Sequence, residues 1–139
     1  MALQSAMVDA LRSAGINFAP GNTDNVCPTK HHFAPGLYAR EILIPAGVVI
    51  VGKIHRHAHV NTISQGHVTV ATEFGTQELR APVSFVSVPG TKRAVFAHED
   101  TVWTTYHPTT ETDLAKIEDL VIAPTFEAYE QGRIGNEVS

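Results

Sequence analysis

The sequence has a single cysteine and no long apolar run. Cys27 alone among 139 residues excludes an intrachain disulfide and is typical of a reducing compartment. No apolar run approaches the roughly 18 residues that a membrane-spanning helix needs. The first residues (MALQSAMVDALRSAG) have neither the basic start nor the continuous apolar core of a signal peptide. We therefore expect a cytoplasmic protein that has no membrane partner.

Charge is also scarce. Charged residues make up 17% of the chain and apolar residues 43%, which favours a folded domain over a disordered one. Ten Lys and Arg against fourteen Asp and Glu give a net charge of −4, which argues against a nucleic-acid partner. The motifs GxxxxGK[ST], GxGxxG, GxSxG and HExxH are absent, so nucleotide-dependent and zincin chemistry have no support. What the chain does have in surplus is histidine, with eight residues.

The middle of the chain has the pattern of an antiparallel β-structure. Between residues 37 and 108, short β-branched runs alternate with turn residues at intervals of roughly ten residues. No helical pattern intervenes, so we expect an antiparallel barrel or sandwich rather than a βαβ fold. The expected strands are 37–44, 48–54, 56–63, 67–73, 76–81, 84–88, 92–97 and 101–107.

The two flanks have different patterns. Residues 2–14 carry apolar side chains at helical spacing, and Gly15 is placed to end that helix. Residues 17–36 are rich in Asn, Pro and Gly, which predicts a loop that wraps the domain. Helical spacing returns from Leu114 to Val121. We therefore divide one domain into an N-terminal helix and wrapping loop, a β-barrel and a helical tail, at residues 1–36, 37–108 and 109–139.

Three histidines lie within residues 55–59. In an extended strand alternate side chains share a face, so His55, His57 and His59 would point the same way, together with Lys53. Neutral imidazole binds transition metals, and residues i and i+2 lie about 6.6 Å apart, close enough to share an ion. If this face lines a barrel interior, the spacing predicts a metal site formed by His57 and at least one of its two neighbours. An exposed polar stripe is the alternative.

The segment 47–66 resembles the first motif of the cupin superfamily. That motif runs Gly, five residues, His-x-His, three or four residues, Glu, six residues, Gly. One register places Lys53 and His55 at the two His positions and His59 at the Glu position. Another register starts at His55 and places Asn61 at the Glu position. Either register keeps several metal-binding side chains on one face.

The second cupin motif, Pro-x-Gly followed by His and Asn, has a counterpart that departs from the pattern. Arg93 stands at the position of the metal-binding His and Ala97 at that of the Asn. Arginine stays charged and does not bind a metal, so the fourth ligand would have to come from His98 or His107. Arg93 could instead bind a carboxylate or phosphate of a small-molecule ligand, with Lys53 as a second candidate. A surface charge beside a turn is the alternative for Arg93.

The resemblance covers roughly residues 37–108. This part of the sequence is similar to small single-domain cupins of bacteria and their phages. It implies an all-β fold, a double-stranded β-helix or cupin-type jelly-roll barrel, with a short N-terminal helix and a short helical C-terminal tail. It implies a divalent transition metal (Zn, Fe, Ni or Mn) as cofactor, and its candidate ligands are His55, His57, His59 and His98. The implied activity is that of a small-molecule metalloenzyme of the dioxygenase, isomerase or lyase type. The alternative is a non-catalytic cupin that serves as a ligand-binding or virion-associated structural module.

A homodimer is expected on general grounds. An open barrel leaves sheet edges that a second copy could cover, and the apolar helix 2–14 could pack across that contact. His31 and His32 are expected in the wrapping loop as surface residues, with a lid over the barrel mouth as the alternative. Trp103 is expected in the core or in the dimer contact.

Overall fold

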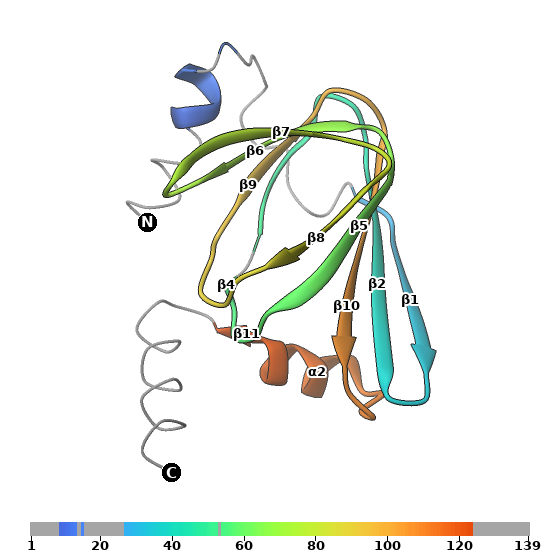
Figure 1. Ribbon diagram of the computed structural model, residues 1–139. Coiled ribbons are helices and arrows are strands. Elements are labelled where there is room, and N and C mark those ends of the chain that lie inside the picture. Colours follow the sequence, from blue (N-terminus) through green and yellow to red (C-terminus); the bar gives the residue numbers. More distant parts are fainter. Residues whose placement is uncertain (1–8, 14, 16–26, 53, 124–139) are drawn as a thin grey trace.

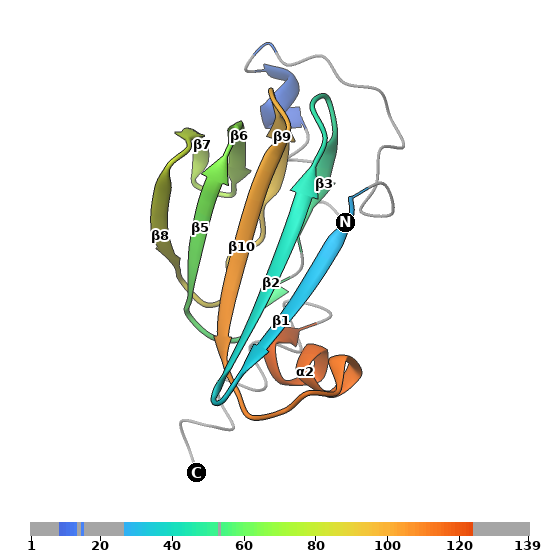
Figure 2. The ribbon, with the colours of Figure 1, turned by 90° about the vertical axis from the view of Figure 1, so that its right-hand side faces the viewer.

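Two antiparallel sheets face each other in the computed structural model, which describes residues 9–13, 15, 27–52 and 54–123 (Figure 1). Sheet A has the strand order β1-β2-β10-β5-β8, with strands Thr29–Ala34, Leu37–Ile44, Thr101–Pro108, His59–Gln65 and Val83–Ser87. Sheet B has the order β3-β9-β6-β7, with strands Val49–Val51, Ala94–Ala97, His67–Thr72 and Gly75–Arg80. Figure 2 shows the strands of sheet A side by side.

The main core fills the space between the two sheets. Alternate residues of each strand point inward, as the pleat of a strand requires. Sheet A contributes side chains such as Ile42, Ile63 and Trp103, and sheet B contributes Val68 and Val95. This arrangement confirms the expected all-β jelly-roll barrel.

The outer face of sheet B carries a second, smaller core. Residues 9–13 are helical, and Leu11 is completely buried. It packs with Val49, Ala71, Ala94 and Phe96, which are the residues of β3, β6 and β9 that face away from the main core. The described turn of the N-terminal helix therefore covers a sheet of its own chain. That the expected helix 2–14 also packs across a dimer contact stays a prediction. Residues 2–8 of the expected helix lie outside the described residues.

A helix follows the last strand of sheet A. Helix α2 spans Leu114–Val121 and begins where the Asp113 carboxylate accepts hydrogen bonds from the backbone N–H groups of Ala115 and Lys116. Its Ile117 is buried. The chain then forms β11 (Ile122–Ala123), which pairs with β4 (Ile54–His55) at the same end of the barrel (Figure 1). The helix expected from Leu114 to Val121 is confirmed, whereas residues 124–139 lie outside the described residues. No helix in the described part of the chain is long and apolar enough to cross a membrane.

Two expectations about the strands are wrong. Residues 29–34 form β1, paired in register with β2, where a loop was expected, so His31 and His32 lie on a strand. The expected strands 48–54 and 56–63 are replaced by β3, β4 and β5, with bends at residues 56–57. The replacement of the two expected strands by three shorter ones has a topological cause, because β3 belongs to sheet B and β5 to sheet A. The chain must cross between the sheets here, and one extended strand cannot lie in both.

Candidate metal centre

Three histidines meet inside the barrel at the end near α2. His55 lies on β4, His59 on β5 and His107 on β10. Their ring centroids are 4.2 Å apart for His55 and His59, 5.0 Å for His59 and His107, and 5.5 Å for His55 and His107. His59 and His107 expose only 4% and 5% of their surface, whereas His55 is half-buried. The three imidazoles thus form one cluster drawn from three strands, called the barrel cluster below.

The direction of these side chains follows from strand alternation. His59 lies four residues before Ile63 on β5, and His107 lies four residues after Trp103 on β10. Ile63 and Trp103 belong to the main core, so the histidines on the same faces also point inward. The pairing of β10 with β5 then brings His107 beside His59.

Burial favours the neutral form of two of these imidazoles, His59 and His107. It lowers the pKa of His107 from 6.5 to about 4, and the charges of His59, Arg40 and His57 act in the same direction. Burial also lowers the pKa of His59, an effect to which the charge of Arg93 adds. Neutral imidazole is the form that binds a metal ion, so the donor chemistry of the barrel cluster fits a transition metal.

Polar side chains support the cluster on both sides. Asn61 is completely buried; its amide donates to Ser87 Oγ at 2.6 Å, and its carbonyl accepts from Trp103 Nε1 at 3.0 Å. Tyr38 stacks on His107 at 6.1 Å between centroids, and its hydroxyl is hydrogen-bonded to His31 Nδ1 at 2.7 Å. Burial raises the pKa of the Tyr38 hydroxyl. The contact between Tyr38 and His107 could not be predicted from the sequence, because it depends on the pairing of β10 with β2.

The imidazole rings of the barrel cluster stack on one another, and their nitrogens do not point to a common centre. The planes of His55 and His107 make an angle of 9°, and His59 is tilted against them by 37° and 40°. Holding one ion would require the rings to turn until their nitrogens point to a common centre. Within the described ranges, one group of three potential ligands already has its ligand atoms within 4.8 Å of one another, and it is a different one, formed by His67, Glu78 and His98.

The other predicted ligands lie in different places. His57 is exposed, in the bend between β4 and β5, so the interpretation that it shares a strand face with His55 and His59 is wrong. Its role as a ligand stays a prediction. His98 stacks on His67 on the outer face of sheet B, so it does not complete the barrel cluster, and His107 takes that place. Lys53 lies outside the described residues.

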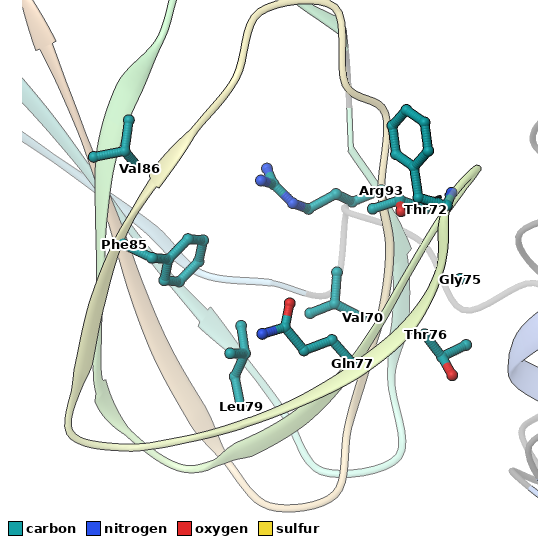
Figure 3. A pocket seen from close by; sticks show the side chains of 10 residues that line it. Val70, Thr72, Gly75, Thr76, Gln77, Leu79, Phe85, Val86 and Arg93 are labelled. Atoms are coloured by element: carbon teal, nitrogen blue, oxygen red, sulfur yellow. Dashed lines mark hydrogen bonds between the residues drawn. The ribbon is translucent and has the colours of Figure 1, made fainter.

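Arg93 reaches into a cavity. The cavity has a volume of about 350 Å³ and lies between β6, β7 and β8. Figure 3 shows the Arg93 side chain extending into it towards Phe85 and Val86, with Gln77 and Val70 on the opposite side. The guanidinium carbon lies 5.8 Å from the centre of the Phe85 ring, and burial lowers the pKa of Arg93.

Arg93 also joins the cavity to the barrel cluster. The residues that line the cavity include no histidine, but the charge of Arg93 lowers the pKa of His59. Phe85 packs edge-on against Trp103, which is hydrogen-bonded to Asn61. Arg93 is therefore a half-buried interior residue, and the alternative of a surface charge does not describe it.

No family model and no curated protein matches the sequence. Among solved structures, KdgF from Halomonas sp. is similar with a TM-score of 0.51 and 22% identity over 68% of this chain and 86% of that one. Ectoine synthase from P. lautus is similar with a TM-score of 0.55 and 11% identity over 70% and 76%. Salicylate 1,2-dioxygenase from Pseudaminobacter salicylatoxidans is similar with a TM-score of 0.56 and 14% identity over 86% of this chain but only 35% of that one.

A further similar structure, a cupin-2 domain protein from Shewanella frigidimarina, has a TM-score of 0.50 and 11% identity over 70% of this chain and 89% of that one. At these identities the likeness concerns the fold. It agrees with the two facing sheets and with the motif resemblance of residues 47–66. The chain has a cupin-type jelly-roll fold.

Proposed function

We propose that the protein binds a divalent transition metal at His55, His59 and His107 and a small anionic molecule beside it at Arg93. The observation that carries the proposal is the barrel cluster itself, three imidazoles from three separate strands inside a cupin barrel. Burial favours the neutral, metal-binding form of His59 and His107. A bound ion would supply Lewis-acid chemistry, and three nitrogen ligands would leave coordination positions open for a substrate.

Arg93 supports the anionic class of ligand. A guanidinium can bind a carboxylate or phosphate through two parallel hydrogen bonds. The cavity into which Arg93 reaches, at about 350 Å³, has the size of a small-molecule site. The charge of Arg93 contributes to the lowered pKa of His59, and our proposal places the anion held by Arg93 beside the metal.

We extend the proposal to a small-molecule enzyme of the dioxygenase, isomerase or lyase type. The dioxygenase and the ectoine synthase among the similar structures support an enzyme of small molecules. A non-catalytic ligand-binding cupin is the second candidate. It is favoured by Arg93, which occupies the position of a metal-binding His in the second cupin motif.

Metal analysis of untagged protein tests the metal site. Wild-type protein, freed of metal with a chelator and reloaded, should bind one transition-metal ion more per chain than the His59→Gln/His107→Gln variant. His32→Gln is the matched control, because His32 pairs with Glu41 on the exposed surface, away from the cluster. The proposal fails if the double variant and the wild type bind the same number of ions.

The ligand site is tested by thermal shift with small carboxylates and their neutral amides. Carboxylates should raise the melting temperature of the wild type more than the matched amides, since a ligand that binds only the folded state stabilises it. Arg93→Gln should remove that difference. Equal shifts for acids and amides in the wild type would contradict the role of Arg93.

A further inference from the structure

A second cluster of metal-binding side chains lies outside the barrel. His67 is on β6, Glu78 on β7 and His98 directly after β9, and their potential ligand atoms all lie within 4.8 Å of one another. Val68 and Ala97, the neighbours of the two histidines, point into the main core. His67 and His98 therefore point to the outer face of sheet B, away from His55, His59 and His107.

His67 has a buried nitrogen without a partner. The side chain is 10% exposed, and its Nε2 has no hydrogen-bond partner among the residues that the structure describes. Glu78 Oε1 lies 3.6 Å from that nitrogen, too far for a hydrogen bond. A buried polar atom without a hydrogen bond lowers the stability of the fold, so each such atom in a native structure calls for an explanation. Two ligands of a tetrahedral ion with bonds of 2.0–2.1 Å are separated by about 3.4 Å, close to the observed spacing.

His98 is held in place by its neighbours. Its Nε2 is hydrogen-bonded to Thr69 Oγ1 at 2.7 Å, so an Nε2–H that donates to the hydroxyl would leave Nδ1 free as a metal ligand. The ring stacks on His67 at 4.3 Å between centroids and meets Phe96 edge-on at 4.9 Å. The backbone N–H of His98 donates to the carbonyl of His67 at 2.8 Å, which fixes the two histidines side by side.

We propose that His67, Glu78 and His98 form a zinc site on the outer face of sheet B. Two imidazoles and one carboxylate are a ligand set that Zn²⁺ accepts in tetrahedral geometry, and the fourth position is open to water. The ion pairs the orphaned His67 nitrogen and brings in the carboxylate that now lies just beyond hydrogen-bond distance. It also ties the edge strand β7 to β6 and to the end of β9. The site does not depend on metal binding inside the barrel.

Zinc binding by the untagged chain tests this site. Equilibrium dialysis of the metal-free His59→Gln/His107→Gln variant should show one Zn²⁺ per chain. Adding Glu78→Gln should abolish this binding, and His67→Gln should do the same. Thr69→Val should weaken it by about 10–100-fold, since Thr69 orients a ligand rather than touching the ion. Adding His32→Gln should change nothing, because that histidine and Glu41, 3.3 Å apart, belong to no group of three potential ligands among the residues that the structure describes.

The outcomes separate this site from the barrel site. Glu78 is 66% exposed, so Glu78→Gln leaves the core intact. If the His59→Gln/His107→Gln variant does not fold, the number of Zn²⁺ ions bound per chain can be compared directly between Glu78→Gln and the wild type. Zn²⁺ retained in both the Glu78→Gln and His67→Gln variants would overturn the proposal, as would a wild type that binds no Zn²⁺. Glu78→Gln can be compared with His59→Gln/His107→Gln by the number of Zn²⁺ ions bound per chain. If Glu78→Gln binds one ion fewer than the wild type and the double variant binds as many as the wild type, the result supports this site and contradicts the barrel site.

Discussion

Buried histidines make the metal-free protein sensitive to acid. The folded chain protonates His107 only near pH 4, whereas an unfolded chain protonates it near pH 6.5. Between these values the unfolded state binds more protons, so the free energy of unfolding falls as the pH is lowered. The shift corresponds to about 3 kcal/mol for His107, complete at about pH 4. His59 and His98, whose pKa values are also lowered by burial, act in the same direction.

Urea unfolding checks this prediction through the fluorescence of Trp103, the only tryptophan of the sequence. The metal-free wild type should lose stability between pH 7 and pH 4.5, and His107→Gln should lose less of it. His32→Gln, which changes an exposed histidine, should follow the wild type. A His107→Gln variant as acid-sensitive as the wild type would contradict the assignment.

Asn61 is predicted to be the polar residue of the core on which stability depends most. Replacing it with alanine leaves the Trp103 indole N–H and the Ser87 hydroxyl without their present partner, at about 1–3 kcal/mol for each. Thr62→Ala is the matched control, since Thr62 is bonded to Ser84 on the exposed side of the same strand pair. Urea unfolding should show a loss of several kcal/mol for Asn61→Ala, on the order of two such groups, and under about 1 kcal/mol for the control. Equal losses would mean that the buried network adds nothing.

At the residue level the sequence predicted part of the site. Two of the three histidines at residues 55–59, His55 and His59, lie in the barrel cluster, and their role as metal ligands stays a prediction. His107 was only one of two alternatives, because its position depends on β10 lying between β2 and β5, and residue spacing does not contain the strand order. The cluster at His67 had no signal for the same reason, since its members come from β6, from β7 and from the residue after β9, and only strand pairing brings these together.

The turn between β5 and β6 shows how one glycine positions two strands. Gly66 has a φ of +105°, and a Cβ there would lie 2.7 Å from the carbonyl oxygen of Asp100 and would also collide with the Thr101 hydroxyl. Gly66 therefore allows the turn to lie directly against the start of β10. Gly47 also has a positive φ, of +86°, but a Cβ there would meet nothing within 4 Å.

This difference predicts unequal effects of two identical substitutions. Gly47→Ala should cost about 1 kcal/mol through the backbone conformation alone. Gly66→Ala should cost about 3 kcal/mol or more, because the strands must also move apart. Thermal unfolding of both variants measures the difference, and similar melting temperatures would refute the close packing of this turn.

At the level of elements, alternation identified the strands that face the core. The expected strand 37–44 matches β2, and those at 67–73, 84–88 and 101–107 match β6, β8 and β10 to within one residue. In β6 five residues in a row are buried, because the main core covers one of its faces and the second, smaller core covers the other. β1 was missed because its side chains are nearly all exposed and give no apolar alternation. The bend at residues 56–57, which separates β4 from β5, was missed because the local sequence does not indicate that the chain crosses from one sheet to the other.

The homodimer expected from the sequence stays a prediction, and the whole molecule now offers a place for it. β8 is an edge strand of sheet A, and its end carries Val86 and Val88, which are 64% and 60% exposed. Val60 on the neighbouring β5 is paired with Val86 and is exposed as well. Exposed apolar residues on a strand whose outer edge has no neighbour in the described sheet are a surface on which a second copy can pair.

Sedimentation velocity tests the dimer at micromolar concentration. The wild type should sediment as a dimer, and Val86→Lys should shift it to the monomer, because a charge at an apolar contact must be buried without a partner. Thr76→Lys, on the edge strand β7 of the other sheet, is the control and should remain dimeric. A monomeric wild type would contradict the prediction.

The central place of β10 in sheet A has a consequence for the order in which the chain can fold. β2 and β5 are not neighbours in the sheet, and both obtain their main partner only from β10, at residues 101–108. While the chain is being synthesised, both strands therefore present open edges until residue 108 has left the ribosome. Closing contacts between segments so distant in the sequence is slow, typically in milliseconds to seconds. The barrel must therefore assemble late and in one step, and the nascent chain is most open to aggregation just before β10 arrives.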